Sequence, residues 1–134
     1  MAPLTSAVPD KIEILAAIET VLTWDLDGPD RPAVNVALGF VQEFTAYGRI
    51  VADDLRTQCL SIPANSQAGR GTQAILSEAA RRLHLSPPAR TPQGAGHRAQ
   101  NIARLVKGLL RAMGEVGEEQ ARARRRHTTT KGTR

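Results

Sequence analysis

The sequence has few cysteines and aromatic residues and no long hydrophobic run. Its one cysteine, Cys59, can form neither an intramolecular disulfide nor a cysteine-based zinc cluster. The longest apolar stretch, VALGFV at residues 36–41, contains a glycine and is far shorter than the roughly 20 residues of a membrane-spanning helix. The first residues lack the basic and apolar regions of a secretory signal. We therefore expect a cytoplasmic protein.

The shortage of aromatic residues also restricts the core. Trp24, Phe40, Phe44 and Tyr47 are the only ones among 134 residues, so the core must consist mainly of Ala, Leu, Ile and Val. Such a core suits packed helices better than a sheet sandwich. The chain length suits one domain.

The first predicted helix spans about residues 11–23. Asp10 and Glu13 have the spacing of an acidic capping box, and an amphipathic apolar pattern follows them. The preceding residues 1–9 contain two prolines and little periodicity, so we expect a flexible N-terminus.

The strongest periodic pattern covers residues 32–62, where apolar residues recur every three or four positions. It predicts one long helix, with two shorter helices as the alternative. Gly39 and Gly48 each weaken a helix by about 1 kcal/mol relative to alanine, but they can also permit a bend or a close helix crossing.

Two more helices are predicted in the second half of the chain. Residues 63–71 have the composition of a loop, and residues 72–85 form an amphipathic helix. The prolines and glycines of residues 86–96 exclude a continuous helix, and a last helix begins at about His97.

Together these segments predict an all-α protein, a small helical bundle of about four helices with a disordered basic C-terminal tail. The bundle domain would cover residues 10–117 and the basic C-terminal extension residues 118–134. Within this extension, residues up to Arg126 can lengthen the last helix, and disorder is expected from His127 onward.

Charge is unevenly distributed, although the formal net charge is only +5. Acidic residues dominate residues 1–65, basic residues dominate residues 66–119, and residues 120–134 contain six bases and no acid. Arg104, Lys107 and Arg111 recur at helical spacing and form a cationic stripe. This stripe could follow a phosphate backbone, or it could face water or the acidic half of the same chain. We favour a stripe that faces water or the acidic half of the chain. The candidate nucleic-acid-binding residues are this stripe and the bases of the tail: Arg104, Lys107, Arg111, Arg122, Arg124, Arg125, Arg126 and Lys131.

The string EAARRLHLSPPAR, at residues 78–90, is similar to the turn of a helix-turn-helix domain. A recognition helix would then have to begin near Ser86. Pro92, Gly94 and Gly96 leave it no stable second or third turn, so we do not expect this motif.

No catalytic or metal site can be assembled from the sequence. His84, His97 and His127 lack metal-ligand spacing, and Cys59 lies on an apolar stripe, as a buried structural residue does. We predict a protein without enzymatic activity, cofactor or metal.

The segments EAARRL (78–83) and HRAQNIARLVKGLLRAM (97–113), joined by a Pro/Gly loop, resemble a family of small helical Streptomyces proteins. That family has no known function and is loosely labelled as natural-product biosynthesis proteins. A fainter likeness, in size, Ala/Arg bias and basic tail, is to transfer and spread accessory proteins of Streptomyces plasmids. These resemblances imply an accessory role and no catalytic residue.

Our leading functional hypothesis is a non-enzymatic accessory protein that binds a protein partner or another copy of itself. It would serve a biosynthetic cluster or the transfer or spread of an actinobacterial plasmid. The alternative is a DNA-binding transcriptional regulator that uses the basic C-terminal half, with non-specific contacts, because a tail without aromatic residues cannot stack bases.

Overall fold

The computed structural model describes the backbone of residues 10–132 and the side chains of residues 10–126, and within this range it contains helices and no strand. The elements are α1 (Lys11–Leu22), α2 (Val34–Gln58), the short 3-10 helix η2 (Cys59–Ser61), α3 (Gln67–Arg82) and α4 (Pro92–Gly132). The predicted all-α class with four helices is confirmed. The predicted flexible segment 1–9 lies outside the described residues.

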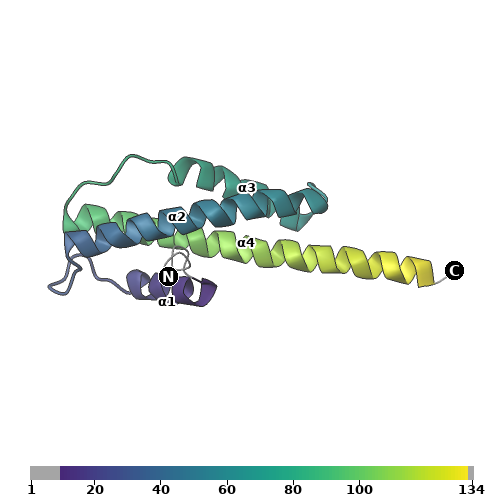
Figure 1. Ribbon diagram of the computed structural model, residues 1–134, viewed down its shortest axis with the longest axis horizontal. Helices are drawn as coiled ribbons and strands as arrows, with labels where there is room; N and C mark the ends of the chain where they lie inside the picture. Colours follow the sequence, from purple (N-terminus) through teal and green to yellow (C-terminus); the bar gives the residue numbers. More distant parts are fainter. Residues whose placement is uncertain (1–9, 133–134) are drawn as a thin grey trace, which may run out of the picture.

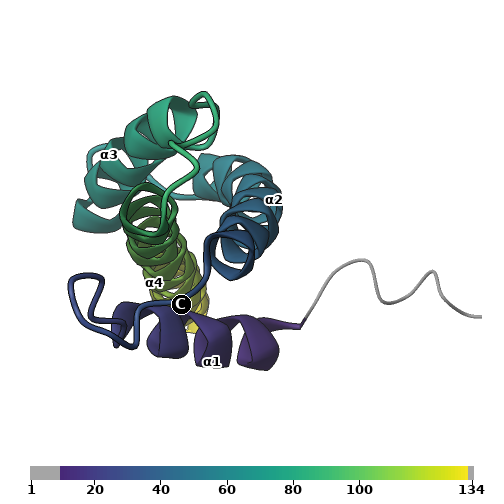
Figure 2. The ribbon, with the colours of Figure 1, turned by 90° about the vertical axis from the view of Figure 1, so that its left-hand side faces the viewer.

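Helix α4 is the central element of the bundle. Viewed along the long axis, α2, α3 and α4 form a triangle, and α1 lies across α2 and α4 on the side away from α3 (Figure 2). Viewed from the side, α4 continues past the ends of α2 and α3 (Figure 1). One helix therefore supplies both the centre of the core and the projection that leaves the bundle.

The core is aliphatic, as the composition predicts. Phe44 is the largest fully buried side chain, and its ring lies 5.5 Å from that of Phe40, which in turn lies 5.7 Å from the ring of Trp24. Most of the remaining core consists of branched aliphatic residues and alanines. Those contributed by α4 are Ala95, Ala99, Ile102, Ala103, Leu105, Val106, Leu109, Ala112 and Val116.

The start of α1 is the predicted capping box. Asp10 Oδ1 accepts from the Glu13 backbone N–H at 2.8 Å, and Glu13 Oε1 accepts from the Asp10 backbone N–H at 3.3 Å. At the other end, the buried amide of Gln100 on α4 donates to the carbonyl oxygens of Val21 and Trp24, each at 3.1 Å. This side chain satisfies C-terminal carbonyls of α1 and fixes the helix on α4.

The long pattern of residues 32–62 forms one helix, α2, followed directly by η2, so the preferred interpretation is confirmed. Gly48 is buried where α2 crosses its neighbours. A Cβ at this position would lie 3.0 Å from Leu83 Cδ2 and 3.3 Å from Val106 Cγ2, so the missing side chain permits a close crossing. Gly39 is exposed and has no such role.

The predicted loop 63–71 is too long, because α3 already begins at Gln67. Ser66 is the N-cap: its Oγ accepts from the Gly69 backbone N–H at 3.0 Å and donates to the Pro63 carbonyl at 2.7 Å. A Cβ on Gly69 would overlap that carbonyl oxygen. Gly69, which suggested a loop, therefore lies in a helix and packs against the backbone of the connection that precedes it.

The start of α4 also differs from the prediction, since the helix begins at Pro92 instead of about His97. Thr91 caps it, with Oγ1 accepting from the Gly94 backbone N–H at 3.0 Å, and proline suits the first helical position. Gly96 is buried against Leu26, so a glycine-rich start is required by close packing.

The end of α4 differs as well. Disorder was predicted from His127, but the backbone is helical as far as Gly132. The preceding Glu, Gln, Ala and Arg residues are strong helix formers, and extending an existing helix needs no new nucleus. The helix is continuous across residue 117, where the sequence suggests that the bundle domain ends.

Candidate functional site

The cationic stripe lies on the part of α4 that packs in the bundle. Lys107 Nζ lies 2.8 Å from Glu19 Oε2 of α1, so this lysine faces the acidic first half of the chain. Arg104 donates to the Asn101 side chain at 3.3 Å, and Arg111 is exposed. These contacts agree with the intramolecular interpretation for Lys107 and leave the two arginines at the surface.

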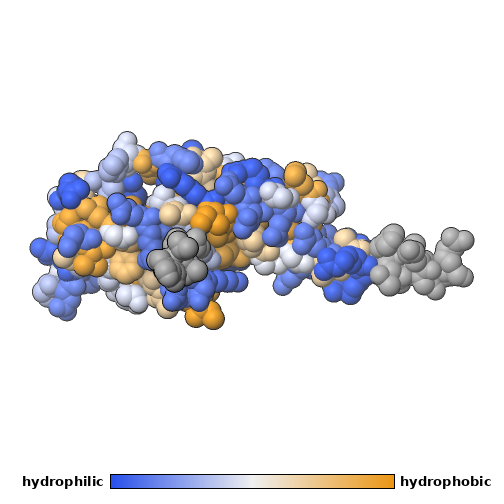
Figure 3. All heavy atoms as spheres, viewed as in Figure 1, coloured by the Kyte–Doolittle hydropathy of each residue, from blue (hydrophilic) through white to orange (hydrophobic). Residues whose placement is uncertain are grey.

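The other candidates lie on what we call the basic end of α4, residues 121–132. Arg122, Arg124, Arg125 and Arg126 are exposed there, on the part of the helix that leaves the bundle. Figure 3 shows a hydrophilic surface at this point. Lys131 is also in this helical segment, but its side chain lies outside the described residues.

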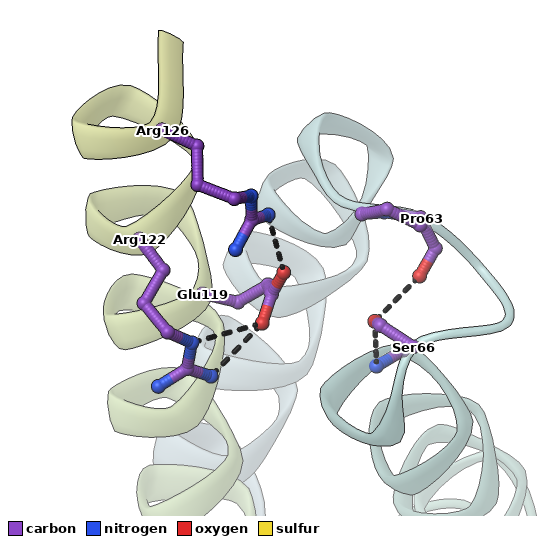
Figure 4. Close-up of polar contacts among 6 residues, drawn as sticks. Pro63, Ser66, Glu119, Arg122 and Arg126 are labelled. Carbon is purple, nitrogen blue, oxygen red and sulfur yellow. Dashed lines mark hydrogen bonds and ion pairs between the residues drawn. The ribbon is translucent and has the colours of Figure 1, made fainter. Parts of the chain in front are cut away.

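A carboxylate holds two of these arginines. Glu119 Oε1 accepts from Arg122 Nε and Nη2 at 3.3 and 2.9 Å, and its Oε2 lies 3.4 Å from Arg126 Nη2 (Figure 4). Glu119 is only 9% exposed. The hydrogen bond from Arg122, reinforced by Arg126, lowers the pKa of Glu119 below its ordinary value against the opposing effect of burial.

No helix begins at Ser86, but Pro92, Gly94 and Gly96, which were expected to prevent stable helical turns, lie in the first turns of α4. After α3 ends at Arg82, residues 85–89 have no regular secondary structure. This connection instead arches from α3 to the start of α4 (Figure 1).

Under the arch lies a cleft of about 410 Å³, between α2, the end of α3 and the start of α4. Its apolar lining includes Leu38, Val41, Leu83 and Ile102, with the half-exposed Leu85 on the connection. The charged lining residues are all arginines, one from each of four segments: Arg49, Arg82, Arg90 and Arg98.

Three of these four guanidinium groups are held by contacts within the protein. Arg49 donates twice to the Leu83 carbonyl, at 3.1 and 2.6 Å, and so caps the end of α3. Arg98 Nη1 donates to the Ser86 carbonyl at 2.8 Å. Arg82 Nε lies 2.9 Å from Glu78 Oε1, an i,i+4 ion pair on α3.

Sequence reasoning missed this cleft. The string EAARRLHLSPPAR, whose likeness to a helix-turn-helix turn we rejected, contributes several of the lining residues. Arg49 lies well before it in the chain and Arg98 shortly after it, and no spacing rule relates the two to each other. The cleft therefore depends on long-range packing.

The described residues contain no group of three or more His, Cys, Asp or Glu side chains that could hold a metal ion. Cys59 is buried, and its Sγ donates to the Arg56 carbonyl at 3.3 Å, as suits a structural residue. His84 and His97 are exposed, and the side chain of His127 lies outside the described residues. Among the described helices, none is long and apolar enough to cross a membrane.

Fold and surface define a small all-α protein with a central helix, an arginine-lined cleft at one end and an arginine-rich projection at the other. Comparison of the chain with protein-family models, curated proteins and solved structures gives no match. The resemblance to small Streptomyces proteins therefore stays a prediction from the sequence.

Proposed function

We propose that the protein is a non-enzymatic binding protein and that the basic end of α4 contacts the phosphate backbone of duplex nucleic acid. The observation that carries the proposal is the position of four arginines within residues 122–126 on a helix that leaves the bundle (Figure 1). Each phosphate contact by an arginine releases counterions from the duplex and so contributes affinity without reading sequence.

The distribution of side chains around this helix favours phosphate over a protein surface. Successive residues of a helix point about 100° apart, so residues 122, 124, 125 and 126 surround the axis. A helix that docks in a protein groove needs apolar anchors at positions such as i, i+3, i+4 and i+7. Ala121 and Ala123 are the only apolar side chains that the sequence offers between residues 121 and 132.

The absence of aromatic residues from this segment points to non-specific binding, because nothing in it can stack on bases. Glu119 supports the proposal in a second way. By accepting from Arg122 and Arg126, it orders two guanidinium groups before a ligand arrives, which lowers the entropy cost of binding.

The test is the binding of a fluorescently labelled duplex to the full chain at about 50 and about 200 mM salt, measured by anisotropy. We expect affinity to fall steeply with salt. Because each lost phosphate contact changes the slope of log K against log salt by about 0.9, Arg124→Gln with Arg125→Gln should flatten the slope by about two. Arg104→Gln with Arg111→Gln removes the same charge from the packed part of α4 and should leave the slope nearly unchanged.

Two results would contradict the proposal: no binding at about 50 mM salt, or equal effects of the two double variants. Binding of polyglutamate without binding of duplex would also overturn it and would assign the basic end to an acidic protein. The hypothesis of a protein partner, derived from the sequence, stays a prediction. Exposed apolar residues such as Ile12 and Leu60, 79% and 83% exposed, are where such a partner could be sought.

A further inference from the structure

The arginine-lined cleft is separate from the basic end of α4, because it lies where α4 begins (Figure 1). We propose that this cleft binds a small organic acid, a carboxylate attached to an apolar chain or ring. The proposal does not depend on nucleic-acid binding.

Charge complementarity identifies the polar part of the ligand. The lining residues include four arginines and no aspartate, glutamate, lysine or histidine. Glu78, which pairs with Arg82 and with Arg81, is not among the lining residues. The charged lining is therefore positive, and an anion would neutralise part of that charge. A carboxylate suits it best because a guanidinium can donate two parallel hydrogen bonds to its oxygens.

The arginines are also positioned in advance. The contacts of Arg49 with the Leu83 carbonyl and of Arg98 with the Ser86 carbonyl fix two guanidinium groups beside the connection. A guanidinium has five N–H donors, so these contacts leave donors for a ligand. A ligand would therefore meet charges whose side-chain entropy is already partly lost.

The apolar lining and the volume identify the rest of the ligand. Leu38 and Val41 of α2 provide aliphatic contact surface, and Leu85 adds more from the connection. A volume of about 410 Å³ falls within the range of small-molecule sites, roughly 300–1,000 Å³.

The experiment is isothermal titration of the full chain with decanoate, decanol and decyltrimethylammonium. The three probes share one alkyl chain and differ in the charge of the head group. We expect saturable binding of one decanoate per chain, with decanol at least about tenfold weaker because it forms no charge-assisted hydrogen bonds. The cation should not bind, because it would meet four like charges.

Arg82 and Arg81 provide a matched pair of variants. Both pair with Glu78, but only Arg82 lines the cleft. Arg82→Gln and Arg90→Gln should each weaken decanoate binding severalfold, and together by about tenfold or more, whereas Arg81→Gln should change it less than about twofold. Helical circular dichroism establishes that each variant is folded. The Arg124→Gln/Arg125→Gln protein should bind decanoate normally, which separates this site from the basic end of α4.

The proposal is overturned if decanoate shows no saturation below about 5 mM, if decanol binds as tightly, or if Arg81→Gln matches Arg82→Gln. Binding of an acidic, apolar peptide without binding of decanoate would equally overturn it and would assign the cleft to a protein segment.

Discussion

Thr72 of α3 is 1% exposed, and its hydroxyl has no hydrogen-bond partner among the described residues. A buried hydroxyl without a partner loses its hydration and gains nothing in return. Valine has nearly the same shape without the hydroxyl. We therefore expect Thr72→Val to raise the free energy of unfolding by about 1 kcal/mol, measured by urea denaturation.

Thr72→Ala is the control for this prediction. It removes the hydroxyl too, but it leaves a small cavity whose cost opposes the gain, so alanine should be the less stable of the two variants. If valine were no better than alanine, the hydroxyl would have to be satisfied in solution, and the prediction would be wrong.

At the scale of the element, two glycines of α4 differ in what surrounds them: Gly96 is packed closely and Gly114 is open to solvent. A Cβ at Gly96 would lie 2.5 Å from Cδ2 of Leu26, a buried residue of the connection between α1 and α2. Gly114 is exposed, and a Cβ there would meet nothing within 4 Å. Gly96→Ala should therefore lower the free energy of unfolding by about 1–3 kcal/mol through overpacking, and Gly114→Ala should raise it by about 0.5–1 kcal/mol through helix propensity.

The two substitutions make the same chemical change in the same helix, so each controls for the other. Urea denaturation at one pH measures both. Equal effects of the two would show that Leu26 moves aside without cost, or that α4 frays near Gly114, and would contradict the packing argument.

The sequence predicts best the helices whose capping residues or apolar periodicity agree with the way they pack in the bundle. Asp10 and Glu13 mark the start of α1, and the apolar rhythm of residues 32–62 marks α2, so both helices are where they were expected. The starts of α3 and α4 were missed because glycines near both signal loops. Only the contacts of Gly69 with the Pro63 carbonyl and of Gly96 with Leu26 show why glycine is required in those helices.

At the scale of the whole molecule, the two candidate sites differ in how far a sequence can reveal them. The basic end of α4 is contiguous, so its charge is visible in the sequence, although its helical form from His127 to Gly132 was not predicted. The cleft combines Arg49, Arg82, Arg90 and Arg98, which are up to 49 positions apart in the numbering. Tertiary packing alone brings them together, so periodicity and spacing carry no signal for it.

The architecture also predicts where α4 stops contributing to the fold. Val116 is fully buried, Glu119 is 9% exposed, and Gln120 Nε2 donates to Ser61 Oγ at 2.6 Å, so packing against the bundle extends to this point. Deleting residues 121–134 removes Arg122 and Arg126, the partners of Glu119, but it leaves that carboxylate one residue from the new chain end, where water can replace them. We therefore expect the unfolding midpoint to fall only slightly, while the salt-dependent binding of duplex is lost. Deleting residues 115–134 also removes Val116 and should cost about 2 kcal/mol or more.

Thermal and urea unfolding of the two truncated proteins, followed by circular dichroism, measures this difference, and size-exclusion chromatography compares their oligomeric states. Because Arg122, Arg124, Arg125 and Arg126 are exposed, the deletion of residues 121–134 should lower the helical signal with little change in the midpoint. A midpoint that falls equally for both deletions would place residues 121–134 within the cooperative fold. The basic end of α4 would then stabilise the bundle, and its arginines could not be assigned to a ligand on the basis of their projection alone.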